Sequence, residues 1–373
     1  MTVPEQYATH IQADTCTVTV ASYTESVTKW ADRYFGQWWH ATPETAPYGR
    51  PLVEADIDPA EVASLTQDVL DPSHQETTYA NAPMLYRRTP GAVVLAAQPG
   101  DQLAYRYDHA AGVLRIVGTE PTPVALAAAR LARELLRGQL MLDGWSILHA
   151  SAVAGADGET VLTFGPKGAG KTTVALLLAR AGWRLLANDR VFVKPDLNGS
   201  GVRVLPWPSA AAIGLGLLDA LGLYQPVAQR VKAGEVLHPT QDQAVTDALL
   251  NGSTAPIRTA KGKELKPQFF PDQLADWLGL TLATEGRAAR LLFPTVTPDG
   301  TPAILDSSKR LGAADFFTAT TEDRYPDVFE LLPVGIDQDA DRVTALLAQL
   351  PHHALTLGHD ADANTALLAK LTT

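Results

Sequence analysis

Residues 165–172 read GPKGAGKT and fit the phosphate-binding pattern G-x-x-x-x-G-K-[ST]. An apolar, β-rich run (ETVLTF) precedes them at 159–164, and the helix-forming run TVALLLAR follows at 173–180. Strand, glycine loop and helix place the positive end of a helix dipole under a bound phosphate. The stretch therefore predicts a nucleoside triphosphate site, in preference to a plain glycine turn.

The same pattern assigns roles to individual residues. Lys171 is expected to reach the β- and γ-phosphates as a compact cation, and the Thr172 hydroxyl is expected to bind Mg²⁺. Thr173 either binds the α-phosphate or caps the helix. The residues expected to hold ATP are Gly165, Gly168, Ala169, Gly170, Lys171, Thr172 and Thr173.

Composition narrows the class of protein. The 373 residues are 46% hydrophobic, enough for two domains or one large elaborated domain. The 30 basic and 41 acidic residues give a net charge of -11, which argues against general binding to nucleic acid or an anionic membrane. Cys16 is the only cysteine, so the chain forms no intrachain disulfide. With neither a signal-peptide pattern nor an apolar run of membrane-spanning length, the sequence predicts a soluble cytoplasmic protein.

Turn signals divide the chain into two expected domains, 1–118 and 119–373. In the first, four β-type runs with short Gly- or Pro-containing gaps predict an antiparallel meander. These runs are 84–88, 92–96, 103–107 and 113–117. Beyond the boundary, Thr122 is expected to cap a long helix that has Pro123 at its first position. We therefore expect a β-rich N-terminal domain followed by an α/β domain that carries the phosphate loop.

Two polar residues outside the loop are candidates for the site. His149 lies in the apolar run 146–154, which is expected to be a buried strand, and it is either a site residue or a satisfied core histidine. Asp189 follows an apolar strand that should lie beside the loop strand. A carboxylate there can hold the metal ion while a hydroxyl approaches the γ-phosphate. The competing interpretation of Asp189 is a surface turn.

Three stretches together resemble a known family. LHASAV at 148–153, GAGKTT at 168–173 and LANDRV at 186–191 are similar to the histidine strand, phosphate loop and "DD-R-V" strand of the HPr kinase/phosphorylase catalytic domain, whose fold resembles that of phosphoenolpyruvate carboxykinase. The resemblance implies a P-loop kinase core with a mixed β-sheet. It also implies ATP and Mg²⁺ as cofactors, and transfer of a phosphoryl group to a hydroxyl. The catalytic residues implied are Asp189, His149 and Lys171, and the metal ligands are Thr172 and Asp189.

The chain departs from this family at two places. Asn188 stands where the family has the first of two aspartates, the one thought to act as base, and an amide cannot accept the proton. Asp189 then does both jobs, His149 takes over as base, or transfer relies on positioning and metal charge. The Glu-x-Arg-Gly phosphorylase loop is not evident near 213–219. We therefore do not expect HPr as the acceptor.

The leading hypothesis is a kinase that acts on a hydroxyl of a small molecule or a peptide in a biosynthetic pathway. A peptide acceptor suits the N-terminal domain, which could bind it by edge-strand pairing. The alternative is a nucleotide-binding regulatory or scaffold protein that is a poor catalyst. Decarboxylation would require a second metal site, which the sequence does not reveal. The sequence is also compatible with a homo-oligomer.

Basic residues late in the chain could close on the phosphates. For each of them alone a solvated surface position is the favoured interpretation. These residues are Arg258, Lys261, Lys263, Lys266, Arg287 and Arg290.

Overall fold

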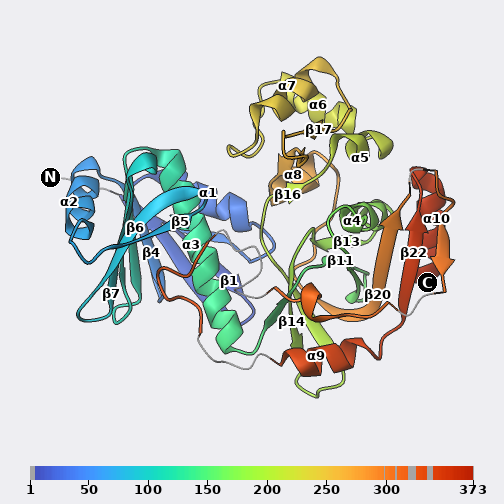
Figure 1. Cartoon of the computed structure of the whole chain (residues 1–373), viewed down its shortest axis with the longest axis horizontal. Helices are drawn as coiled ribbons and strands as arrows, with labels where there is room; N and C mark the ends of the chain where they lie inside the picture. The colour runs from blue at the N-terminus through green and yellow to red at the C-terminus, as the bar shows by residue number, and fades with distance from the viewer. Residues whose placement is uncertain (1–4, 298, 307–308, 318–324, 334–338, 373) are drawn as a thin grey trace. The chain divides into compact units, whose positions relative to one another are not determined.

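The structure is a computed structural model that describes residues 5–297, 299–306, 309–317, 325–333 and 339–372 (Figure 1). The chain forms two compact units. Unit 1 comprises residues 1–145 and 318–338, and unit 2 comprises 146–317 and 339–373. No helix among the described residues is long and apolar enough to cross a membrane.

Unit 1 is built on a nine-stranded sheet with the order β3-β1-β2-β4-β9-β8-β7-β6-β5. Its strands are β1 (Tyr7–Ala13), β2 (Cys16–Ser22), β3 (Thr42–Glu44), β4 (Leu52–Ile57), β5 (Gln75–Tyr79), β6 (Ala82–Thr89), β7 (Val93–Gln98), β8 (Leu103–Asp108) and β9 (Val113–Gly118). Strands β5 to β9 pair antiparallel in chain order. This confirms the expected meander.

Three α-helices cover this sheet. They are α1 (Glu25–Phe35), α2 (Pro59–Val69) and α3 (Pro121–Leu142). Helix α3 packs against α1 and against strands β2, β4 and β9, and α2 packs against β7 and β8 (Figure 1). Fourteen residues of α3 are buried, because its alanines and leucines recur with helical spacing.

The observed boundary between the units lies after Trp145, whereas the sequence placed it at Gly118. The reason is that the apolar face of α3 is buried on the sheet of unit 1. The start of this helix also differs, since Glu120 is the N-cap and Pro121 the first helical residue. Pro121 and Pro123 both suit the first turn, where the backbone N–H has no intrahelical acceptor, and the helix begins at the earlier one.

A late segment of the chain, residues 325–333, belongs to unit 1. The Tyr325 ring lies edge-on to Tyr79 at 5.6 Å, and the Arg130 guanidinium lies 4.9 Å from the centre of the Tyr325 ring. At Gly138 of α3 this segment comes so close that an added Cβ would lie 2.1 Å from the Leu331 carbonyl oxygen. Sequence patterns do not predict this long-range contact.

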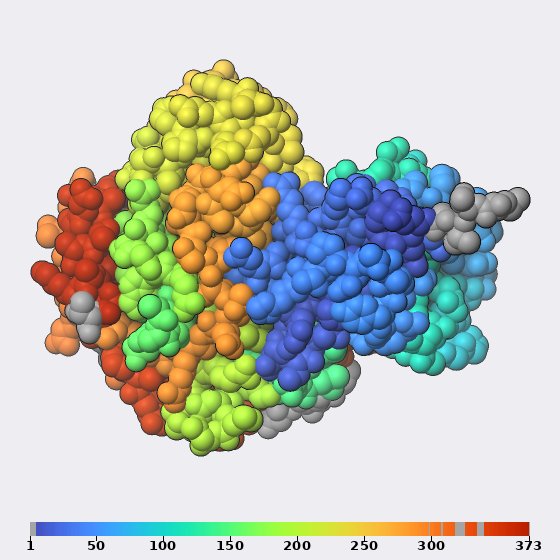
Figure 2. All heavy atoms as spheres, turned by 180° about the vertical axis from the view of Figure 1, so that it is seen from behind, coloured from blue at the N-terminus to red at the C-terminus, as the bar shows by residue number. Residues whose placement is uncertain are grey.

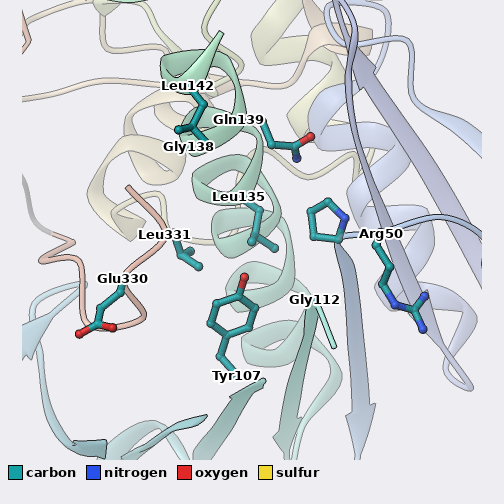
Figure 3. Close-up of a pocket in the computed structure, with 10 residues that line it drawn as sticks. Arg50, Tyr107, Gly112, Leu135, Gly138, Gln139, Leu142, Glu330 and Leu331 are labelled. Atoms are coloured by element: carbon teal, nitrogen blue, oxygen red, sulfur yellow. The ribbon is translucent and has the colours of Figure 1, made fainter. Parts of the chain in front are cut away.

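Unit 1 also contains a pocket of about 330 Å³. Figure 3 shows the Tyr107 side chain pointing toward Leu135 of α3, with Leu331 beside them and the Arg50 guanidinium farther out. All of its lining residues come from unit 1. The pocket is therefore separate from the phosphate loop, which lies in unit 2.

Unit 2 has a second sheet with the order β10-β14-β15-β20-β12-β11-β13, and β22 pairs with both β20 and β21. Its strands are β10 (Ser146–Leu148), β11 (Ser151–Ala154), β12 (Glu159–Thr163), β13 (Arg184–Ala187), β14 (Val191–Pro195), β15 (Val202–Pro206), β20 (Gly286–Val296), β21 (Ala303–Leu305) and β22 (His352–Leu357). Strand β20 runs parallel to β12 and β22, whereas β11 runs antiparallel to β12. The expected mixed sheet is confirmed.

Helices and a helical insertion complete unit 2. Helix α4 (Lys171–Arg180) packs against α10 (Ala361–Thr372), and α9 (Ala340–Leu347) packs against β14 and β15. The insertion lies between β15 and β20, and its α6 and α7 region forms the yellow lobe in Figure 2. It contains β16 (Ala211–Ala212), α5 (Leu215–Ala220), α6 (Tyr224–Lys232), α7 (Gln243–Asn251), β17 (Ile257–Arg258), β18 (Glu264–Leu265), β19 (Gln268–Phe269) and α8 (Pro271–Asp276).

Candidate functional site

The phosphate loop connects β12 to α4 as the sequence predicts. Gly168 and Gly170 have φ angles of +86° and +108°, which favour glycine. A Cβ at Gly170 would also lie 2.8 Å from the Val296 side chain, so the backbone passes close to β20. At Gly168 an added Cβ would meet nothing within 4 Å, so there is open space beside the loop.

The start of α4 fits an anionic ligand. The first N–H groups of a helix have no intrahelical acceptor, and the N-cap here is Gly170, which has no side chain to occupy them. Together with the helix dipole, these donors form an anion site. The residues present therefore suit an anionic group such as a phosphate.

Lys171, the first residue of α4, is partly withdrawn from solvent. Its ammonium donates to the carbonyl oxygens of Gly165 at 2.6 Å and Pro166 at 3.4 Å. Burial lowers the pKa of Lys171, while the charges of Asp189 and Asp315 oppose that shift. Two carboxylates from separate segments thus act electrostatically on the loop lysine.

Two polar breaks in the sheet bring the other candidates toward the loop. The histidine break (residues 149–150) separates β10 from β11, and the aspartate break (residues 188–190) separates β13 from β14. The sequence suggested one continuous strand at 146–154, and at 184–193 an apolar strand interrupted by the polar residues 188–190. The breaks arise because the two halves pair with different neighbours, β10 with β14 and β11 with β13.

Register places these breaks side by side. Leu148 pairs with Val191 before the histidine break, and Ala152 pairs with Ala187 after it. Strand β11 also neighbours β12, whose last residue leads into the phosphate loop. The histidine break, the aspartate break and the loop therefore lie at one end of adjacent strands.

His149 is half-buried within its break. Its backbone N–H donates to the Asp315 carbonyl oxygen at 2.7 Å, and its ring lies edge-on to Phe317 with centroids 5.3 Å apart. The same Phe317 ring lies under the Arg190 guanidinium at 4.2 Å. Residues 315–317 thus contact both breaks.

Asp189 is an exposed carboxylate in the aspartate break, with 57% of its side chain accessible. Arg190 is its neighbour, with Nε 3.9 Å from a carboxylate oxygen. The described residues hold no group of three or more His, Cys, Asp or Glu side chains that could bind a metal ion. A Mg²⁺ site at Thr172 and Asp189 would therefore take most of its ligands from phosphate oxygens and water, as Mg²⁺ commonly does.

The late basic residues separate into different environments. Arg287 pairs with Asp196 at 3.1 Å, and Arg290 contacts the His353 ring at 3.4 Å. Lys266 lies 3.5 Å from Glu264, and its charge also acts on Lys171. Of the six candidates, Lys266 is thus the one with an electrostatic link to the loop lysine. The other three are Arg258, Lys261 and Lys263, which are exposed.

Asp315 and Phe317 are site residues that sequence reasoning missed. They come from the run ADFF at 314–317, where an acid precedes two aromatics in a polar region. That run is a weak signal, because nothing local relates it to the phosphate loop.

The similarity of this chain to known proteins is confined to solved structures. No model of a protein family matches the chain, and no curated protein matches its sequence. Among solved structures, it is similar to the HPr(Ser) kinase/phosphatase from Coxiella burnetii, with 13% identity over 43% of this chain and 66% of that chain. The TM-score is 0.20, and the match spans less than two thirds of that enzyme.

Proposed function

We propose that unit 2 is a phosphotransferase that uses ATP and Mg²⁺ to phosphorylate a hydroxyl group. The observation that carries the proposal is Lys171, a partly desolvated cation in a glycine loop at a helix start, close enough to two carboxylates for their charges to act on it. Phosphoryl transfer depends mainly on positioning and on stabilising charge, and this arrangement supplies both.

The chain's own groups divide the work. The N–H groups at the start of α4 and the Lys171 ammonium bind the β- and γ-phosphates, and Lys266 adds positive charge from the insertion. Thr172 and Asp189 would hold Mg²⁺, which neutralises phosphate charge when bound. His149 lies beside Asp315 at the same end of the sheet and is a candidate to orient the acceptor or take its proton.

The acceptor proposed is a small molecule or a peptide of a biosynthetic pathway, rather than HPr. Unit 1 suits a peptide because the outer strands β3 and β5 end its sheet, and four of the five β5 residues have exposed or half-buried side chains. An extended peptide could pair with such an edge. Incubation of the protein with Mg-ATP and candidate acceptors, read out as a phosphate mass shift, tests the proposal.

A second candidate function is a nucleotide-dependent regulatory or scaffold protein. Asn188 and the proximity of Arg190 to Asp189 favour it, because both reduce the basic character available at the aspartate break. ATP binding without phosphorylation of any acceptor, combined with a nucleotide-dependent change in partner binding, would support this alternative and contradict the kinase.

Asp189→Asn should lower Mg²⁺-dependent transfer by about 100-fold, because the amide loses the charge that holds the metal ion. Steady-state turnover across a Mg²⁺ titration measures the effect. Asp157→Asn, in the turn before β12, is the matched control and should retain wild-type turnover. Full activity of Asp189→Asn would show that this carboxylate is a surface group only.

His149→Ala should separate a chemical role from a packing role. If the imidazole orients or deprotonates the acceptor, turnover should fall about 100-fold with little change in the melting temperature. Turnover and thermal unfolding are measured on the same samples. A lower melting temperature with turnover preserved at low temperature would assign His149 to packing against Phe317.

A further inference from the structure

Transfer to a hydroxyl releases the hydroxyl proton, and the Asn188 amide cannot accept it. Among the carboxylates near the phosphate loop, Asp189 is exposed and lies beside Arg190. Asp315 is the second carboxylate whose charge acts on Lys171. It is half-buried, unlike the exposed Asp189.

Hydrogen bonds with neighbouring backbone groups hold Asp315 and its segment in place. It ends the short 3-10 helix η2 (Ala313–Asp315), and its Oδ2 atom accepts the Gly312 N–H at 2.9 Å. Its carbonyl oxygen accepts the His149 N–H at 2.7 Å, and the Phe317 N–H donates to Ile147 at 2.9 Å. The segment is thus fixed to the strand end that carries the histidine break.

The same strand end is tied to the phosphate loop. Ser151, the first residue of β11, donates its hydroxyl to the Lys171 carbonyl oxygen at 2.9 Å. Ser151 lies two positions after His149, so one short segment contacts both Asp315 and the start of α4. The second carboxylate oxygen of Asp315, Oδ1, accepts no hydrogen bond from the described part of the chain.

We propose that Asp315 supplies the carboxylate that receives the proton of the attacking hydroxyl, in place of the carboxylate absent at Asn188. The inference rests on the phosphotransferase function proposed above. The acceptor oxygen bonds to the γ-phosphorus, and the bond from that phosphorus to the β,γ-bridging oxygen breaks. ADP leaves with the electron pair, and the hydroxyl proton passes to Oδ1 of Asp315.

Asp315→Asn tests this role with little risk to the fold, because the amide oxygen can still accept the Gly312 N–H. With water as the probe acceptor, Mg-ATP hydrolysis should fall about 100-fold. The dissociation constant for ATP should stay within about threefold and the melting temperature should be unchanged, since the loop donors remain. Asp306→Asn, an exposed carboxylate earlier in the same region, is the matched control and should behave as wild type.

A second variant makes the test specific. Adding Asn188→Asp to Asp315→Asn should recover at least about tenfold of the lost rate, because a carboxylate returns to the same end of the sheet. Asp315→Asn with near-wild-type hydrolysis overturns the inference, as does a double variant no faster than Asp315→Asn. Wild-type hydrolysis no faster than that of Lys171→Ala instead overturns the phosphotransferase function itself, so the two failures are distinguishable.

Discussion

Lys171→Ala is expected to lower Mg²⁺-dependent ATP turnover by about 100- to 1000-fold, the loss seen when one preorganised electrostatic group is removed. The ammonium is partly desolvated, and its charge is therefore less screened than that of a surface lysine. ATP affinity should fall as well, because the lysine contacts phosphates in both the bound and transition states. Nucleotide titration and steady-state kinetics separate the two effects.

Lys167→Ala provides the matched control for this prediction. Lys167 lies in the same loop, but its side chain is exposed. Its removal should change turnover by less than about threefold, because a solvated charge contributes little. Equal losses for the two variants would indicate a general effect of loop charge, and near-normal turnover of Lys171→Ala would refute the loop assignment.

The phosphate loop could be predicted because its geometry is encoded locally. Glycine is needed where the backbone turns with positive φ at Gly168 and Gly170, and Lys171 follows at the start of the helix. The antiparallel meander also follows from hydrophobic patterns and turn residues within short windows, whereas the mixed sheet was expected from the family resemblance. The loop and the meander depend on residues that are close together in the sequence, so the sequence alone is enough to predict them.

The remaining site residues depend on contacts between distant segments. Asp315 reaches His149 only because Phe316 and Phe317 add to the strand that ends at Leu148. The charge of Lys266 acts on Lys171 from an insertion between β15 and β20, and nothing in its own segment distinguished it from Lys263. Such pairings require the register of the folded sheet.

The two strand breaks also depend on contacts that local sequence patterns do not predict. Apolar runs around His149 and Asp189 have the composition of single strands, and sequence patterns do not indicate that each run changes partners midway. The exchange of neighbours is a property of the whole sheet. The exchange also places both polar breaks at one end of the strands, where the candidate site lies.

Glu134→Gln should destabilise unit 1 by about 3–5 kcal/mol, the usual cost of removing one partner from a buried charge cluster. Glu134 of α3 accepts from Arg133 at 3.0 Å and from Arg137 at 2.9 Å, and all three side chains are less than 10% exposed. Arg133 also donates to the Tyr34 hydroxyl at 2.8 Å. Glutamine would remove the negative charge that these two buried guanidinium groups share.

Chemical denaturation followed by tryptophan fluorescence measures the loss in free energy of unfolding caused by Glu134→Gln. Glu120→Gln, at the exposed start of the same helix, is the matched control and should change the free energy of unfolding by less than about 0.5 kcal/mol. A loss of similar size in both variants would show that the buried cluster contributes no net stability.

The difference in free energy of unfolding between wild type and Glu134→Gln should also depend on pH, and it should become smaller in acid. Burial alone would raise the pKa of Glu134, but the charges of Arg133 and Arg137 outweigh burial and hold it below its ordinary value of 4.5. A carboxyl group with a depressed folded-state pKa stabilises the protein above its unfolded-state pKa, and that stabilisation is lost as the pH falls through the folded-state value. Wild type and Glu134→Gln should therefore differ fully at neutral pH, and the difference should shrink only as the pH falls below about 4.5. A constant difference down to strongly acidic pH would indicate that shape rather than charge explains the effect.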